Sequence, residues 1–185
     1  NEYVKKTLGS SYNGSSITLS LGSTRSVKIE IVGDVVAPGS YTMSAFSTLF
    51  NALYTAGGIS TMGTLRDIKV FRAGKEVSKI DVYDYIMNGN NTGNIRLQDN
   101  DLVIVGAYDA IVEVQGKVKR PMKYEIKEGE TLSALMSYVG GFMGDAYTKN
   151  VRVTRKNGRE YTVHTVEKSD FSNFKLMDGD VVFVD

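Results

Sequence analysis

Short runs of alternating apolar and polar residues occur along most of the chain, and they come in the same order in two stretches. Each stretch opens with a β-branched run, which predicts a strand over residues 27–32 and another over 111–115. Apolar residues spaced three and four apart then predict a helix with one apolar stripe in each stretch. The two stripes are Phe46, Leu49, Phe50 and Leu53 in the first stretch, and Leu132, Leu135, Met136 and Val139 in the second.

The rest of each stretch is rich in strands. Two strands joined by a tight turn follow each helix, and a final apolar strand closes each stretch. The predicted ranges are 67–72, 76–82 and 102–105 in the first stretch, and 150–155, 160–165 and 181–184 in the second. A helical turn is expected near 81–87. Residues 1–26 are polar and rich in Ser and Gly, with one strand-like alternation over 17–21.

The two stretches are copies of one unit, set 83 positions apart. The chain has two prolines, and they occupy the same place in each copy. The matching positions that mark the unit are Gly33, Pro38, Tyr41, Gly57 and Gly58 in the first copy, and Gly116, Pro121, Tyr124, Gly140 and Gly141 in the second. A tandem repeat predicts two similar domains. Two near-equal copies of a scaffold signature also argue against an enzyme.

The order strand, strand, helix, two strands, final strand is that of a β-grasp, a mixed sheet wrapped across one helix. We therefore expect an α+β protein with two tandem β-grasp domains, each a small mixed sheet packed on one helix. The expected boundaries are 1–26 for an N-terminal extension, 27–106 for the first domain and 107–185 for the second.

Composition narrows the function classes. The formal net charge is +1, so attraction to nucleic acid is not expected. There is no cysteine, which excludes disulfides, thiolate metal sites and cysteine nucleophiles. No apolar run approaches the roughly 18 residues of a membrane span. The chain begins with Asn1, and we expect it to be an excised part of a longer protein. No phosphate loop or dinucleotide motif is present, and no cofactor or metal is expected.

The spaced motifs resemble the SLBB domain, the soluble ligand-binding β-grasp. The first copy carries Val32-Gly33-Asp34-Val35, Pro38-Gly39-Ser40-Tyr41, Ala56-Gly57-Gly58 and Leu97-Gln98-Asp99-Asn100-Asp101. The second copy departs at Met122, where the family has Gly, and at Val139, where it has Ala. The resemblance covers about 155 residues of the chain.

Tandem domains of this kind are similar to those of outer-membrane polysaccharide export proteins of the Wza type. The resemblance implies a non-enzymatic periplasmic segment of a capsule or exopolysaccharide exporter in a Gram-negative bacterium. It also implies packing with other copies in a ring-shaped channel, contact with polysaccharide and an inner-membrane export partner. A soluble module that binds a glycan or another small molecule is the alternative, and an enzyme is a third.

Basic residues are the candidate contacts. A cluster on the first hairpin of the second copy contains Lys117, Lys119, Arg120, Lys123 and Lys127, whereas the first copy has no positive charge between Glu30 and Arg66. The cluster is expected either to contact an acidic polysaccharide, an acidic subunit face or lipid head groups, or to be a solvated hairpin balanced by nearby acids. Arg66, Arg72 and Arg155 complete the candidate set. Arg72 and Arg155 recur in register, which indicates either an ion pair within each unit or a repeated subunit contact.

Other polar motifs favour structural roles. The acid pairs Asp99 with Asp101 and Asp178 with Asp180 suit turns better than calcium or a glycosidase pair. His164 is the one histidine and cannot build a zinc site alone. The in-register Tyr41 and Tyr124 indicate a shared packing role, and each Gly-Gly pair is expected to end a helix.

Overall fold

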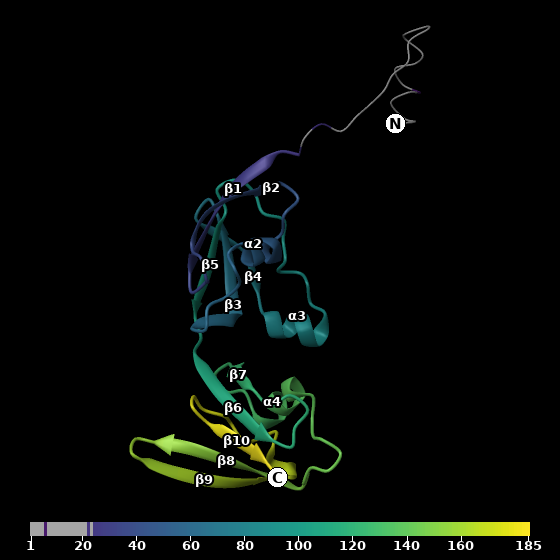
Figure 1. Cartoon of the computed structure of the whole chain (residues 1–185), viewed down its shortest axis with the longest axis vertical. Helices are drawn as coiled ribbons and strands as arrows, with labels where there is room; N and C mark the ends of the chain where they lie inside the picture. The colour runs from purple at the N-terminus through teal and green to yellow at the C-terminus, as the bar shows by residue number, and fades with distance from the viewer. Residues whose placement is uncertain (1–5, 7–21, 23) are drawn as a thin grey trace.

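The computed structural model describes residues 6, 22 and 24–185 and shows two domains arranged end to end (Figure 1). Each domain contains one five-stranded sheet, with strand order β2-β1-β5-β3-β4 in the first and β7-β6-β10-β8-β9 in the second. This confirms the predicted α+β fold. The strand expected over residues 17–21 lies outside the described residues.

The elements follow the predicted order in both domains. The first domain contains β1 (Ser26–Gly33), β2 (Gly39–Ser44), α2 (Leu49–Thr55), β3 (Gly63–Arg72), β4 (Lys75–Ile80), α3 (Val82–Asn88) and β5 (Leu102–Ala107). The second contains β6 (Ala110–Gly116), β7 (Lys123–Ile126), α4 (Leu132–Val139), β8 (Asn150–Asn157), β9 (Glu160–Glu167), the 3-10 turn η1 (Lys168–Asp170) and β10 (Val181–Val184). None of the helices in the described part of the chain is long and apolar enough to cross a membrane.

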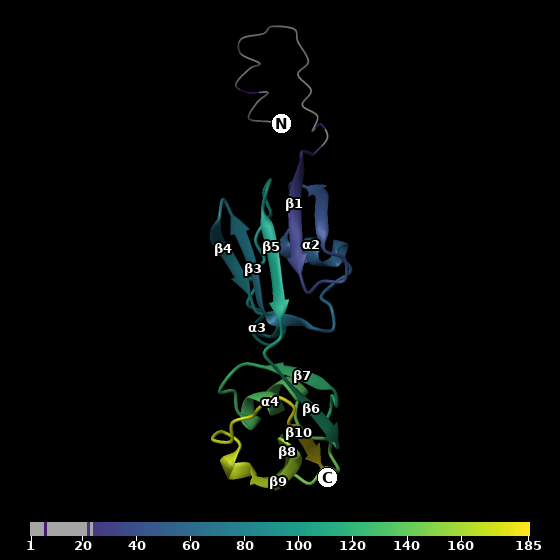
Figure 2. The same cartoon turned by 90° about the vertical axis from the view of Figure 1, so that its left-hand side faces the viewer.

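The two sheets have the same mixed topology. β1 pairs antiparallel with β2 and parallel with β5, and β6 does the same with β7 and β10. The hairpin β3–β4, like β8–β9, is antiparallel. Figure 2 shows the first sheet with β2 and β4 at its opposite edges.

The helix stripe was predicted fully in one domain and in part in the other. All four stripe residues of α4 are buried, and the helix ends at Gly140 in the left-handed conformation. In the first domain Leu49 and Leu53 are buried together with Ala52 and Ala56. Phe46 is 62% exposed, so its place in the buried stripe was wrong. The cause is the start of α2 at Leu49, which leaves Phe46 in the preceding turn.

The repeated glycine at the end of the first strand has a steric reason. Gly33 and Gly116 have φ values of 91° and 84°, a region that side chains disfavour. A Cβ at either position would lie 2.0 Å from the carbonyl oxygen of Val105 or Val184. Only glycine lets the chain turn this close to the final strand of its own domain.

The repeated tyrosine closes the turn that follows. The Tyr41 hydroxyl donates to the Ala37 carbonyl at 2.5 Å, and the Tyr124 hydroxyl donates to the Arg120 carbonyl at 2.7 Å. Both rings also pack against the core of their domain, which confirms the shared packing role.

Candidate functional site at the domain junction

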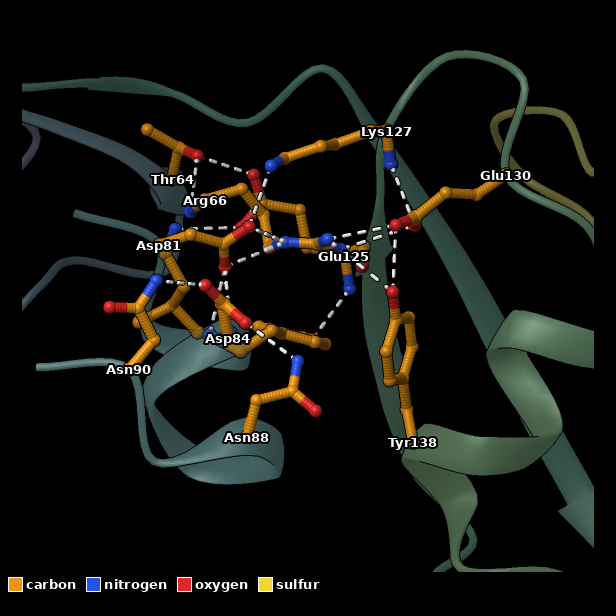
Figure 3. A network of polar contacts seen from close by, with 12 residues as sticks. Thr64, Arg66, Asp81, Asp84, Asn88, Asn90, Glu125, Lys127, Glu130 and Tyr138 are labelled. Carbon is orange, nitrogen blue, oxygen red and sulfur yellow. Dashed lines mark hydrogen bonds and ion pairs between the residues drawn. The ribbon is translucent and has the colours of Figure 1, made fainter. Parts of the chain in front are cut away.

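Residues from both domains meet in one polar cluster where the two sheets approach each other (Figure 3). The first domain contributes the start of β3 and the helix α3, and the second contributes β7 and α4. Two residues, Tyr108 and Asp109, separate β5 from β6. We call this contact the junction cluster; its members are Thr64, Arg66, Asp81, Tyr83, Glu125, Lys127, Glu130 and Tyr138.

Arg66 is the centre of the junction cluster and is only 5% exposed. Its Nε donates to both carboxylate oxygens of Asp81, at 3.0 and 3.1 Å. Its Nη atoms donate to the two carboxylate oxygens of Glu130, at 3.1 and 2.8 Å. The guanidinium therefore joins one carboxylate from each domain, and its planar fork suits two such partners at once.

Two tyrosines enclose this guanidinium. The Arg66 Cζ lies 4.5 Å from the centre of the Tyr83 ring and 5.3 Å from that of Tyr138, within cation–π range. The two rings meet edge to face at 5.1 Å. The Tyr138 hydroxyl donates to Glu130 at 2.7 Å, and the Tyr83 hydroxyl accepts from the backbone N–H of Glu125 at 2.9 Å.

A second set of contacts crosses the junction beside Arg66. The buried Glu125 carboxylate accepts from the Thr64 hydroxyl and from the Leu65 backbone N–H, the latter at 2.7 Å. The Lys127 ammonium lies 2.6 Å from Asp81. A buried charge is tolerated only when its hydrogen-bonding capacity is met, and each carboxylate of the junction cluster has at least two partners.

Local structure holds Asp81 in place. Asp81 is the N-cap of α3, and its side chain accepts from the backbone N–H groups of Tyr83 and Asp84. Asp84 in turn accepts from the side chains of Asn88 and Asn90, both at 2.6 Å, which ties the end of α3 to the following loop (Figure 3). The capped helix thus presents Asp81 and Tyr83 to the second domain.

The junction cluster shifts the ionisation of its members. Burial disfavours the charged forms of Asp81 and Glu130, but the hydrogen bonds from Lys127, Arg66 and Tyr138 outweigh it and lower the pKa of both carboxyl groups. Burial and the hydrogen bond to Glu130 raise the pKa of Tyr138 to about 12. At neutral pH the carboxylates are therefore charged and Tyr138 remains a donor.

The junction residues are not repeated between the copies, in contrast to the scaffold residues. The first-copy positions equivalent to Glu125, Glu130 and Tyr138 hold Thr42, Ser47 and Thr55, and the second-copy position equivalent to Arg66 holds Lys149. Sequence reasoning placed Arg66 among the candidate contacts but missed its acidic and aromatic partners. The sequence signal that could have identified these partners was this difference between two copies that otherwise match.

Arg72 and Arg155 form the same ion pair within each domain. Arg72 contacts the carboxylate of the fully buried Asp101 at 2.8 Å through two nitrogens, and Arg155 contacts Asp180 at 2.9 and 2.7 Å. Each arginine also donates to a backbone carbonyl, that of Arg96 or Lys175. We call this arrangement the Arg–Asp clasp. Of the two roles open from sequence, the geometry shows the ion pair within each unit.

The basic hairpin of the second domain is exposed. Lys117 pairs with Asp145 at 2.9 Å, and the Arg120 Nε donates to the Val139 carbonyl at 3.3 Å beside Gly140. Lys119 and Lys123 are exposed, and among the described residues neither they nor Arg120 forms an ion pair. A groove of about 250 Å³ lies next to them at the junction, lined by residues of both domains that include Tyr83, Met87, Arg120, Lys123 and Tyr138.

The remaining candidates have structural surroundings. Asp99 and Asp178 each accept a backbone N–H at 2.8 Å, from Lys28 and Ile111, as expected for turn residues. His164 lies on β9 with its ring 5.6 Å from that of Phe174. No group of three potential metal ligands occurs in the described ranges.

Comparison with known families identifies both domains. A model described as the SLBB domain matches residues 27–105, and a second model with the same description matches residues 111–164. The chain belongs to the SLBB domain family. The matches to both copies agree with the duplicated fold, and the second match ends before β10 and Asp180.

Among characterised proteins, the SLBB chain is similar to two Escherichia coli sequences named Polysialic acid transport protein KpsD. Each is 28% identical over 183 residues, which is 98% of this chain. The chain spans 32% of the length of these relatives. The similarity includes both SLBB domains.

Proposed function

We propose that this chain is a non-enzymatic periplasmic segment of a protein that exports capsule or exopolysaccharide across the outer membrane of a Gram-negative bacterium. The observation that carries the proposal is the pair of SLBB domains in one continuous similarity to a polysialic acid transport protein. In this proposal the two domains are structural parts of a channel, and neither cleaves nor builds the polymer.

The proposed mechanism is geometric. Copies of the full-length protein pack side by side, and closed cyclic symmetry produces a ring around the path of the polysaccharide. The junction cluster supports this role because two ion pairs, Arg66 with Glu130 and Lys127 with Asp81, tie the two domains of each copy together. An inner-membrane export partner would deliver the polymer to this ring.

The test is an export assay in the host strain. Cells that lack the full-length protein are complemented either with the intact protein or with a form from which residues 24–185 are deleted. We expect the intact form to restore surface polysaccharide, measured by labelling of whole cells. The deleted form should leave polymer inside the cell, measured in lysates. Normal surface polysaccharide in the strain that lacks the protein would contradict the proposal.

A second candidate function is recognition of an acidic glycan, and the junction groove favours it. Arg120 and Lys123 border the groove without an ion-pair partner in the described part of the chain, while Tyr83 and Tyr138 provide aromatic edges. Lys117 and Lys119 lie on the same hairpin.

The test is a titration of isotope-labelled protein with purified acidic oligosaccharides from the host, followed by amide shifts in NMR spectra. Saturable shifts confined to the groove, and lost in Arg120→Gln with Lys123→Gln, would support recognition. An unchanged spectrum at millimolar sugar would reject it and leave the hairpin as a solvated or subunit-contact surface.

A further inference from the structure

Charged residues are nearly absent from one stretch of the first domain. Residues 30–65 contain two of them, Glu30 and Asp34. The equivalent stretch of the second domain, 113–148, contains ten: Glu113, Lys117, Lys119, Arg120, Lys123, Glu125, Lys127, Glu128, Glu130 and Asp145. Because the two domains share one fold, the fold does not require this depletion. Loss of charge is the compositional mark of the centre of a protein interface.

This charge-poor stretch of the first domain carries exposed aromatic side chains, and Arg96, from a later part of the domain, lies 5.6 Å from the centre of the Phe46 ring. Phe50 and Tyr54 are one turn apart on α2, and Phe46 lies in the turn before it. Phe46 is 62% exposed and Tyr54 is 82% exposed. The equivalent positions of the second domain hold Gly129, Ser133 and Ser137, which are small and carry no apolar surface of comparable size.

The aromatic surface continues onto α3. The ring of Phe50 lies 4.9 Å from that of Tyr85, which is 40% exposed. We call Phe46, Phe50, Tyr54 and Tyr85 the aromatic face. Single exposed apolar residues are ordinary, but a run of neighbouring ones marks a contact surface.

The neighbouring sheet edge is also unprotected. β2 is an edge strand of the first sheet, and its sequence from Gly39 to Ser44 contains no charge and no proline. The equivalent edge strand β7 carries Lys123 and Glu125. Exposed edges are commonly blunted by charges because their free backbone groups otherwise pair with another strand. In both views α2 lies close to β1 and β2, on the same side of the domain (Figures 1 and 2).

We propose that the aromatic face and the β2 edge dock a second copy of this chain, in a head-to-tail contact within the assembly. This inference rests on the proposed function, which places copies side by side. A free strand edge calls for protein backbone, because only another strand can pair with its unpaired N–H and C=O groups. β2 and β4 are the opposite edges of one sheet (Figure 2), so a contact from the β2 side of one copy to the β4 side of the next is head-to-tail. Such a contact gives a ring where the rotation between copies closes.

The experiment places a photo-activatable cross-linking amino acid at Tyr54 of the full-length protein, in the cells that produce it. The matched control carries the same amino acid at Ser137, the equivalent exposed position of the second domain. We expect covalent copy-to-copy products from position 54 and at least tenfold fewer from position 137. Mass spectrometry should find the partner peptide in the first domain of the neighbouring copy.

A charge variant gives a second readout. Tyr54→Glu should reduce the assembled fraction in sedimentation of the purified full-length protein at least fivefold, and Ser137→Glu should leave it unchanged. Cross-links from position 54 to another protein or to glycan, or an assembly that forms equally well with Tyr54→Glu, would overturn the docking surface and leave the ring intact. A full-length protein that never assembles would overturn both the ring and this surface.

Discussion

In each domain an arginine after the helix reaches a buried aspartate through the same set of hydrogen bonds, whereas the junction cluster and the aromatic face occur once each. The shared contacts are internal to a domain, and the unshared ones lie on its outer faces. The two copies therefore share the contacts that stabilise each domain, and they differ in the residues on the surfaces through which each domain contacts its surroundings. Differences between the copies, more than their similarities, point to the surfaces that carry function.

The largest expected effect tests whether the Arg–Asp clasp is equivalent in both domains. Arg72→Met and Arg155→Met should each lower the free energy of unfolding of their own domain by about 3–5 kcal/mol, because each leaves a buried carboxylate without its partner. Urea denaturation followed by amide signals of each domain measures this. Arg152→Met is the control: its ion pair with Asp185 is half-exposed on both sides and should be worth about 0–1 kcal/mol. A large loss in one domain alone would show that the clasps have diverged.

The next largest effect tests the contact between the domains without changing the core of either domain. Arg66→Met should remove about 2–3 kcal/mol of coupling between the domains, since it takes the cation away from the partly buried Glu130 of the second domain and breaks its link to Asp81. Residual dipolar couplings should then report domains that reorient independently. Lys149→Met, at the equivalent exposed position, should change stability by less than about 0.5 kcal/mol. Unchanged domain alignment in the Arg66 variant would mean that the linker alone fixes the arrangement.

Acid should act on the same contact. The pKa values of Asp81 and Glu130 are lowered by folding, so their stabilising contribution is present above the unfolded pKa values, near 4, and is lost as pH falls through the folded values. We expect energy transfer between one dye on each domain to fall below about pH 4 in the native protein. In Arg66→Met the same transition should be weaker or absent. A transition of equal size in both proteins would place the acid-sensitive groups elsewhere.

The smallest effect tests the repeated turn. Tyr41→Phe and Tyr124→Phe should each cost about 1 kcal/mol, because each removes one hydrogen bond to a backbone carbonyl four residues earlier. Thermal unfolding of the two variants compares them directly. If Tyr41→Phe lowered the stability and Tyr124→Phe did not, the Arg120 carbonyl would have found another hydrogen-bond donor.

The fold was predictable because the sequence contains two copies of the same unit. Each copy checks the other, so the matches of Gly33 with Gly116 and of Tyr41 with Tyr124 marked the turns of both units, and the apolar period located both helices. Phe46 was misplaced because the 3.6-residue period continues through it, while α2 begins only at Leu49.

The candidate site was less accessible from sequence. Arg66 was selected as a cation for an external partner, but its partners Asp81 and Glu130 are 15 and 64 residues away along the chain. The contact with Asp81 depends on how α3 packs beside β3, and the contact with Glu130 depends on the relative placement of the two domains; no local pattern encodes either. The Arg–Asp clasp was one of two open interpretations for the same reason, since a repeated arginine shows a repeated role without naming its partner.

The short connection between the domains has a mechanical consequence. Tyr108 and Asp109 alone link β5 to β6, and the backbone N–H of Tyr108 is itself held by the Met62 carbonyl at 3.0 Å. With so little slack in the chain and ion pairs filling the contact beside it, torque applied to one sheet passes to the other. In the proposed channel, a polymer that pushes on one domain would therefore move both domains together.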